Sequence, residues 1–371
     1  MRYYIIAGEA SGDLHASNLM KELKLRDEHA DFRCWGGDLM QAQGAELVKH
    51  YRDLAFMGFA EVLFNIRTII RNMKFCKQDI LSYKPDVLIL VDYPGFNLRI
   101  AKFAAESGIR VFYYISPQIW AWKKSRVFKI KKYVERMFVI LPFEKDFYAN
   151  YDYKTDFVGH PLLDAIDTES KGDEEFRKAA GLDDRPVIAV LPGSRKQEIK
   201  KMLPVMAEMT TFFPNYQFVI AAAPSLPEEF YSCACRNMPV KIVKNRMHDI
   251  LRIASAAMVT SGTATLETAL FKVPEVVCYK GGWLSYYIAR QLVVNIKYIS
   301  LVNLIMDREV VKELIQGEFN VSTLKAELSS LLNDESHREK MIEDLNDLHK
   351  ELGGPGASAN TAELMYTALK Q

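Results

Sequence analysis

Cysteine is scarce in this chain of 371 residues, and the five present are scattered: Cys34, Cys76, Cys233, Cys235 and Cys278. An odd, dispersed set gives no disulfide framework, and the close pair at 233 and 235 has no second pair to complete a zinc site. We therefore expect a reducing, cytoplasmic compartment. Long apolar runs are also missing, so we expect no segment to cross a bilayer, and the strand-like start argues against a signal peptide.

Net charge is almost absent, because 48 Lys and Arg residues against 47 Asp and Glu leave +1. Bulk electrostatics therefore argue neither for nor against a polyanionic ligand, which must be met by a local patch. Hydrophobic residues make up 49% of the chain and charged residues 26%, as in folded globular proteins. Since 371 residues exceed one ordinary core, we expect two domains.

Short apolar segments alternate with longer helical patterns along the whole chain. The predicted strands are 2–7, 32–35, 86–91, 111–115, 137–140 and 155–158, then 187–191, 217–222, 241–243, 257–260 and 276–279. Strands separated by helices form parallel sheets wound by right-handed crossovers. The polar segment 164–184 between the two series is typical of a linker with an exposed helix. The predicted fold class is α/β, with two doubly wound Rossmann-like domains facing a central cleft.

The central feature of the second series of strands is a strand that ends at a glycine-containing loop and is followed by a helix. We call such a connection a glycine-opened loop. The run 254–259 reads as a buried strand that stops at 260–262 and continues as a helix from about Ala264. Free N–H groups at such a helix start form a seat for phosphate, and Glu267, one turn further, can accept hydrogen bonds from ribose hydroxyls. The alternative is an ordinary β–α connection in which the helix dipole favours Glu267.

A second strand end of this kind follows the run 187–191. Gly193 and Ser194 supply backbone N–H groups and a hydroxyl there, and Arg195 supplies a fixed, charged fork suited to phosphate. The alternative is a structural loop with a surface arginine. Later in the same domain, Asn303 and Arg308 are candidate polar contacts to a base or a phosphate.

The first domain presents carboxylates at two strand ends. The loop 8–13 brings Glu9 and Asp13 towards the expected cleft, and its spacing is neither a dinucleotide fingerprint nor a P-loop. A tight turn with Asp13 as a helix cap is the equal alternative. Asp92 follows the buried run 86–91, where a carboxylate is well placed for proton abstraction, although it can instead cap the following helix.

Two stretches combine basic and apolar residues. Six of the ten residues 123–132 are basic, and either a solvated helix or a site for a phosphorylated or membrane-surface ligand accounts for them, since no nucleic-acid module surrounds the run. In segment 56–81, a three-four spacing predicts a core-facing stripe from Val62 to Ile80. The flank of this stripe suggests contact with an anionic membrane, although a wide core face is the somewhat favoured alternative. The flank consists of Phe59, Leu63, Phe64, Ile70, Arg67 and Arg71.

Nine blocks of sequence, in order along nearly the whole chain, together resemble the lipid-A-disaccharide synthases, a family of glycosyltransferases with the GT-B fold. The blocks are residues 8–13, 91–97, 116–122, 126–130, 141–144, 159–161, 191–195, 261–267, and 298–303 with 308–309. Each block alone is weak, whereas the ordered set is highly specific.

The resemblance implies a reaction in which UDP-2,3-diacylglucosamine donates its sugar to the 6-hydroxyl of 2,3-diacylglucosamine 1-phosphate. The products are a β-1,6-linked disaccharide 1-phosphate and UDP, with inversion at the transferred carbon. It further implies that Asp92 deprotonates the acceptor, and that Arg195 with nearby backbone amides neutralises the departing UDP. No cofactor and no metal are expected, and the cleft loops lack an Asp-x-Asp pair.

The remaining site residues follow from the matched blocks. The implied donor-binding set is Gly193, Ser194, Ser261, Gly262, Thr263, Ala264, Glu267, Asn303 and Arg308. The implied acceptor or cleft set is Glu9, Ser11, Gly12, Asp13, Asn97, Ser116, Gln118, Trp120 and His160. Two positions depart from the family pattern. Gly95 stands where many relatives have a second aspartate, and Val302 replaces a common proline, which leaves the pose of Asn303 open.

The resemblance also implies an organisation and a location. Residues 1–165 are expected to form an acceptor- and membrane-facing domain, 166–356 a UDP-sugar-binding domain, and the last helix, 357–371, to dock back onto the first. Because both substrates are acylated, we expect peripheral association with the inner face of the cytoplasmic membrane of a Gram-negative bacterium. Monomer and homodimer both stay open. The alternatives are another GT-B transferase or epimerase that uses UDP-N-acetylglucosamine, and a non-catalytic nucleotide-sugar-binding protein.

Overall fold

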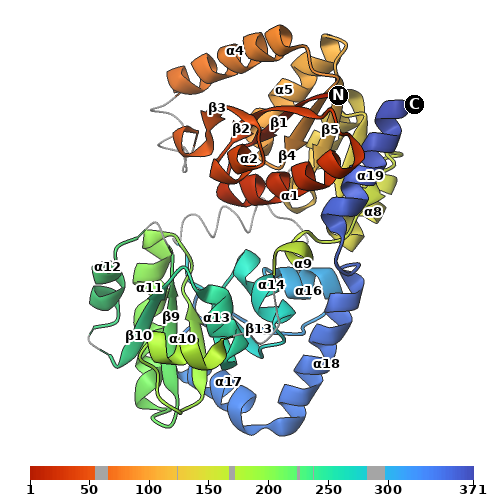
Figure 1. The fold of residues 1–371 in the computed structure, drawn as a ribbon. Coiled ribbons are helices and arrows are strands. Elements are labelled where there is room, and N and C mark those ends of the chain that lie inside the picture. Colours follow the sequence, from red (N-terminus) through yellow and green to blue (C-terminus); the bar gives the residue numbers. More distant parts are fainter. Residues whose placement is uncertain (55–65, 123, 167–171, 224–225, 237, 282–296) are drawn as a thin grey trace. The chain divides into compact units, whose positions relative to one another are not determined.

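A computed structural model describes residues 1–54, 66–122, 124–166, 172–223, 226–236, 238–281 and 297–371 (Figure 1). The chain divides into two compact units. Unit 1 consists of residues 1–164 with 352–371, and unit 2 of residues 165–351. No helix in the described ranges is long and apolar enough to cross a membrane.

Unit 1 is built on a parallel sheet with the strand order β3-β2-β1-β4-β5-β6-β7. The strands are β1 (Arg2–Ala7), β2 (Asp31–Gly36), β3 (Glu46–His50), β4 (Val87–Val91), β5 (Arg110–Tyr114), β6 (Arg136–Val139) and β7 (Asp156–Phe157). Since the order reverses between β1 and β4, the carboxyl ends of these two strands meet at a topological switch point, where Ala7 pairs with Val91. Ligands of open α/β sheets bind at such points.

The helices of unit 1 cover both faces of its sheet. They are α1 (Ala10–Arg26), α2 (Asp38–Ala42), α4 (Ile66–Tyr83), α5 (Pro94–Glu106), α6 (Ile119–Trp122), α7 (Val127–Tyr133), α8 (Pro142–Ala149), α9 (Leu162–Ala165, across the unit boundary) and α19 (Ala357–Lys370), with 3-10 turns η1 (Tyr51–Asp53) and η2 (Lys124–Arg126). Right-handed crossovers put α1 on one face and α4, α5 and α7 on the other, because the strand order runs in opposite directions from β1 and from β4.

The C-terminal helix α19 packs along α1 in unit 1 (Figure 1). Its first turn is held by Asp164, whose carboxylate accepts hydrogen bonds from the amides of Gly356 at 2.6 Å and Ser358 at 2.8 Å. An anion at a helix N-terminus is favoured by the helix dipole. Further along, Arg26 on α1 donates to Glu363 at 2.9 Å.

Unit 2 contains a second parallel sheet, with the order β10-β9-β8-β11-β12-β13 and a switch point between β8 and β11. Its strands are β8 (Val187–Leu191), β9 (Gln217–Ala222), β10 (Val240–Lys244), β11 (Ala254–Thr260), β12 (Glu275–Tyr279) and β13 (Lys312–Ile315). Its helices are α10 (Asp173–Ala179), α11 (Lys196–Glu208), η3 (Met209–Thr211), α12 (Glu228–Ala234), α13 (Met247–Arg252), α14 (Thr263–Leu270), α16 (Leu301–Met306), α17 (Val321–Asn333) and α18 (Glu335–Glu351).

All the predicted strands are confirmed, and two further strands were not predicted. Central strands such as β4 and β8 are buried at every position, so their apolar runs are visible in the sequence. The two missed strands, β3 and β13, lie at the outer edges of the two sheets. Edge strands carry charged residues that keep the sheet from pairing further. In Glu46–His50 and Lys312–Ile315 the charged residues interrupt the apolar run from which a strand is predicted.

Candidate active site

The two glycine-opened loops of unit 2 lie side by side at its switch point. Leu191, at the end of β8, pairs with Val259 near the end of β11. Gly193 has a φ of +85°, and a Cβ at this position would lie 2.8 Å from Thr260 Cγ2. Only glycine therefore allows the loop after β8 to approach the end of β11 this closely.

The loop between β11 and α14 is tied down on one side and open on the other. Ser261 Oγ donates to the Ile299 carbonyl at 2.9 Å, and Thr265 Oγ1 donates to the Gly262 carbonyl at 2.8 Å. Gly262 and Thr263 are exposed, and no described atom lies within 4 Å of the place where a Cβ of Gly262 would stand. The start of α14 is thus exposed at Gly262 and Thr263, and a helix N-terminus of this kind suits an anion.

Arg195 immediately precedes α11, and its side chain is 73% exposed. It forms an ion pair with Glu198, with 3.0 Å between Nη1 and Oε1. An exposed pair of this kind contributes little free energy, so the guanidinium can exchange the carboxylate for a phosphate at small cost. Its predicted role in phosphate binding is compatible with this position and stays a prediction.

Glu267 has a partner that the sequence analysis did not identify. His248 Nε2, on α13, lies 2.8 Å from Glu267 Oε2, and the His248 ring packs on Phe271 at 5.4 Å between centroids. The pair fixes the direction of the carboxylate predicted to hold ribose. The residues around His248 form no motif, so no sequence signal could have found it.

The prediction that the Asn303 side chain contacts a nucleotide is wrong, because its polar atoms all form hydrogen bonds within unit 2. Its Nδ2 donates to the Val311 carbonyl at 2.8 Å and to Glu313 at 3.0 Å, while its Oδ1 accepts from the Val310 and Val311 amides. The residue is fully buried and no donor or acceptor is left for a nucleotide. Asn303 instead holds the segment before β13 in place.

Arg308 forms an ion pair within unit 2. Its guanidinium grips Asp344 on α18 with two nitrogens, Nη1 at 2.7 Å and Nη2 at 2.8 Å from the carboxylate oxygens. A bidentate pair of this geometry is specific and already neutral. Arg308 therefore joins the segment after α16 to α18, and its predicted contact with the donor stays a prediction.

In unit 1, Asp92 lies in a strained turn directly after β4. Asp92 and Tyr93 have φ values of +41° and +49°, a left-handed backbone that non-glycine residues rarely adopt. Two hydrogen bonds to the Asp92 carbonyl hold this turn, from Asn97 Nδ2 at 2.7 Å and from the Tyr113 hydroxyl at 2.5 Å. Strain that the surroundings enforce in this way is characteristic of functional sites.

The ionisation of Asp92 is shifted by its surroundings. Burial, and then the negative charge of Glu9 in the neighbouring loop, raise the pKa of Asp92 to about 6. Gly8 allows the two loops to approach, because a Cβ there would lie 2.3 Å from the Tyr93 ring. A carboxyl group with a pKa near neutrality is suited to accept a proton in catalysis.

Several predicted cleft residues of unit 1 turn inwards. The Asp13 carboxylate accepts from the amides of Gly37, Leu39 and Met40 and so caps α2, which is the capping alternative at the start of another helix. Asn97 is fully buried under the Asp92 turn. The Asp13 carboxylate is occupied by these internal hydrogen bonds, whereas Asn97 Oδ1 has no hydrogen-bond partner among the described residues, so a ligand contact by Asn97 stays a prediction.

The other predicted cleft residues of unit 1 fall into an exposed group and a buried group. Glu9, Ser11 and Gln118 are exposed and available, whereas Gly12 is buried against Ala7. Ser116 is buried and its Oγ lies 2.8 Å from the Tyr148 hydroxyl. Whether the exposed group contacts an acceptor stays a prediction.

Three further side chains of unit 1, His160, Trp120 and Glu144, are described by their burial and packing. His160 is buried, its Nδ1 accepts from the Leu162 amide at 3.2 Å, and burial lowers its pKa to about 3, so it is a neutral turn residue. Trp120 packs edge-on against Phe143. The nearby Glu144, which the sequence analysis did not single out, is buried, and burial raises its pKa to about 8.

Half of the predicted membrane flank lies outside the described residues, namely Phe59, Leu63 and Phe64. The other three lie on α4, where Arg67, Ile70 and Arg71 are exposed, Ile70 by 63%. The core-facing stripe is confirmed at its C-terminal end, where Cys76 and Ile80 are fully buried, whereas Ile69 and Met73 are only partly buried. Membrane contact by this flank stays a prediction.

Comparison with known proteins places the chain in one family. A family model described as lipid-A-disaccharide synthetase matches residues 3–366. The lipid-A-disaccharide synthase of Syntrophus aciditrophicus is 40% identical over 374 residues, which are 99% of this chain and 97% of that protein. The corresponding enzymes of Myxococcus xanthus and Coxiella burnetii are 38% and 37% identical, covering 99% and 98% of this chain and 97% and 98% of those proteins.

Solved structures support the fold. A UDP-GlcNAc 2-epimerase from Neisseria meningitidis bound to UDP-GlcNAc superposes with a TM-score of 0.69 at 13% identity, covering 100% of both chains. The calicheamicin glycosyltransferase CalG4 gives 0.62 at 16% identity, covering 99% of this chain and 98% of that one. The α/β fold of the GT-B type is thereby confirmed. By its family match and its curated relatives, the chain belongs to the lipid-A-disaccharide synthases and is a glycosyltransferase of lipid A synthesis.

Proposed function

We propose that this enzyme transfers 2,3-diacylglucosamine from UDP to the 6-hydroxyl of 2,3-diacylglucosamine 1-phosphate, with inversion at the transferred carbon. Family membership supports the overall reaction. The Asp92 turn carries the mechanistic part of the proposal, because an aspartate is held there in a strained backbone, partly buried and next to a second carboxylate. That combination raises its proton affinity without removing it from the ligand-binding edge of its sheet.

The proposed chemical step is a single displacement. Asp92 takes the proton of the acceptor 6-hydroxyl while that oxygen forms a bond to the anomeric carbon of the donor. The bond from this carbon to the β-phosphate oxygen breaks, and its electron pair leaves with UDP. One displacement inverts the anomeric configuration, and the transition state has oxocarbenium character, as in other inverting sugar chemistry.

The leaving group is the proposed ligand of the two glycine-opened loops of unit 2. Arg195 and the amides near Gly193 and Gly262 would bind the diphosphate and neutralise the charge that builds on it. Glu267, directed by His248, would hold the ribose. One fold relative, the epimerase from Neisseria meningitidis, is bound to UDP-GlcNAc, which agrees with a nucleotide sugar as the donor class.

The decisive experiment incubates the enzyme with both acylated glucosamines and follows disaccharide and UDP together, in the presence of a chelator. Formation of both products in equal amounts supports the proposal. UDP release without disaccharide would contradict the acceptor assignment. Interconversion of UDP-N-acetylglucosamine with its C2 epimer would favour the epimerase alternative, and nucleotide-sugar binding without turnover the non-catalytic one. A β-linkage in the product, measured by the anomeric proton coupling, tests inversion.

A further inference from the structure

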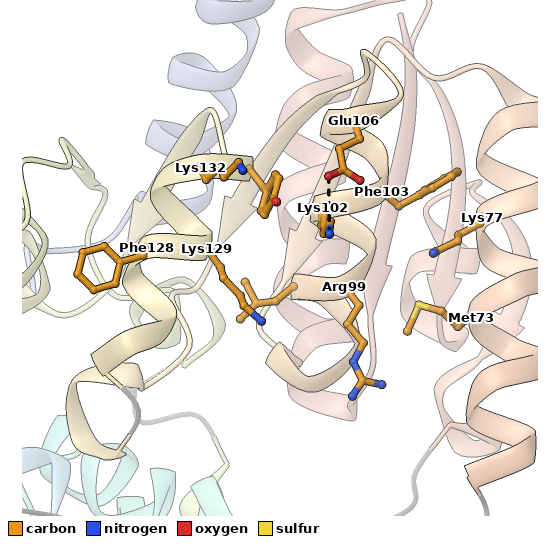
Figure 2. Close-up of a pocket in the computed structure, with 11 residues that line it drawn as sticks. Met73, Lys77, Arg99, Lys102, Phe103, Glu106, Phe128, Lys129 and Lys132 are labelled. Atoms are coloured by element: carbon orange, nitrogen blue, oxygen red, sulfur yellow. Dashed lines mark ion pairs between the residues drawn. The ribbon is translucent and has the colours of Figure 1, made fainter.

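A basic groove lies on the helical face of unit 1, between α4, α5 and α7. It has a volume of about 710 Å³ and is formed at the meeting of three helices. Figure 2 shows Lys129 pointing from α7 towards α5, Arg99 extending along α5, and Met73 and Lys77 pointing towards α5 from α4. Phe103 and Tyr133 supply apolar surface between the charges.

Positive charge in this groove is largely uncompensated. Five cations line it, Lys77, Arg99, Lys102, Lys129 and Lys132, against the single carboxylate of Glu106. Glu106 reaches only Lys102, at 3.8 Å, and that pair is more than half exposed. Within the described ranges, Arg99 and Lys129 have no ion-pair partner. A chain with a net charge of +1 thus concentrates several positive charges at one place, which attracts an anionic ligand.

Two cations of the groove lie over aromatic rings. Lys77 lies over the Phe103 ring at 5.0 Å and Lys132 over Tyr133 at 5.3 Å. Aromatic faces attract these cations weakly and leave their ammonium donors free for a stronger, anionic partner.

An apolar hollow continues the groove along α4. It has a volume of about 260 Å³, and it shares Met73, Lys77 and Arg99 with the basic groove while adding Ile69, Ile70 and Lys74. Two exposed hydrophobic side chains stand on this face, Ile70 at 63% and Phe128 at 64%. Basic residues beside exposed apolar ones suit a ligand with an anionic head and a hydrocarbon tail, whereas a free anion has no use for the apolar part.

We propose that the α4–α5–α7 groove binds the phosphate headgroup of an anionic phospholipid in a bilayer. Arg99, Lys77 and Lys129 hold the phosphate oxygens, and Met73, Ile69 and Ile70 contact the first carbons of the acyl chains. The site is separate from the groups proposed to act on the sugar substrates. It accounts for Lys129 and Lys132, which the proposed reaction does not use, and it does not depend on the identity of the sugar acceptor.

Vesicle partition of the full-length protein tests this site. The probe is sedimentation with neutral phosphatidylcholine vesicles and with vesicles that also contain phosphatidylglycerol. The variant is the double replacement Arg99→Gln and Lys129→Gln. The matched control is Lys21→Gln with Lys24→Gln, which removes the same charge from exposed positions on α1, on the opposite face of the sheet. Unchanged melting temperatures show that both variants are folded.

The groove variant should lose about fivefold in partition per charge removed, roughly 25-fold in all, on anionic vesicles only. The control should lose far less. Equal losses in both variants, or no loss in the groove variant, would overturn the proposal, because the attraction would then be general or reside elsewhere. Displacement of the wild-type protein from the vesicles by low millimolar inorganic phosphate, at constant ionic strength, would also overturn it in favour of a free-phosphate site.

Discussion

The two switch points of this enzyme use their polar groups in opposite ways. In unit 1 several polar side chains of the loops form hydrogen bonds within the unit: Asp13 caps α2, Asn97 supports the Asp92 turn, and Ser116 contacts Tyr148. The groups that remain are the exposed Glu9, Ser11 and Gln118 and the carboxylate of Asp92, which is held in a strained, partly buried position. In unit 2 the amides at Gly262 and the guanidinium of Arg195 stay exposed.

This difference matches two different chemical tasks. A general base needs a defined position and a raised pKa, and both require burial and a rigid frame. A seat for a diphosphate needs several accessible donors, and glycine-rich turns at helix starts supply them at little cost in strain. We infer that unit 1 is organised around one reacting group and unit 2 around recognition of charge. The following predictions test that division.

The largest expected effect comes from Asp92→Asn. The amide keeps the size of the side chain but cannot take a proton, so turnover should fall on the order of 1,000-fold while UDP binding in unit 2 is retained. Turnover is measured by disaccharide formation and UDP affinity by calorimetry. Unchanged turnover would refute the base assignment, and loss of both properties would show that the two switch points are not independent.

The same substitution should stabilise the protein. A pKa raised from 3.8 to about 6 means that the native state binds the Asp92 proton more tightly than the unfolded state. The stability tied to this group is therefore fully present below pH 3.8 and is lost as the pH rises to about 6. The uncharged amide of the Asp92→Asn variant removes this loss, so thermal unfolding at pH 7.5 should show a gain on the order of 2 kcal/mol. The gain should shrink as the pH is lowered towards 4. A destabilised variant at neutral pH would contradict the cause assigned to the shift.

Arg195→Ala should rank next, with a loss on the order of 100-fold in kcat, because the guanidinium acts mainly on the charge of the departing diphosphate. Arg185→Ala is the matched control, since Arg185 is also an exposed arginine paired with a nearby acid, Asp183, at 2.7 Å. Steady-state kinetics on both variants decide the case. Equal losses of kcat in the two variants would mean that Arg195 is only a surface residue of a structural loop.

Replacing Glu9 by Gln should change the pH profile rather than the maximal rate. Because the Glu9 carboxylate contributes to the raised pKa of Asp92, its removal lowers that pKa. The acid limb of kcat/KM, expected near pH 6 in the wild type, should move to lower pH in Glu9→Gln. Profiles of both proteins over the acid range measure this. An unmoved limb would assign it to a group other than Asp92.

The sequence predicted the central strands and both glycine-opened loops, because buried parallel strands and the turns that follow them leave strong local signals. It did not predict β3, β13 or His248. The edge strands are masked by charge, and the contact of His248 with Glu267 joins two helices across 19 residues of chain. Asn303 was misassigned for the opposite reason: its motif is visible, but only coordinates show that Val310, Val311 and Glu313 use every donor and acceptor.

The smallest expected effect is that of His248→Ala, and it separates positioning from chemistry. Loss of the ring frees the Glu267 carboxylate to turn, so KM for the donor should rise about threefold to fivefold while kcat changes little. His337→Ala is the control, because His337 also faces a carboxylate, Glu327, at 3.4 Å. A fall in kcat with unchanged KM would place His248 in the reaction itself. If both variants behave like the wild type, the hold on ribose does not depend on this pair, and unit 2 recognises the donor through its phosphate-facing loops.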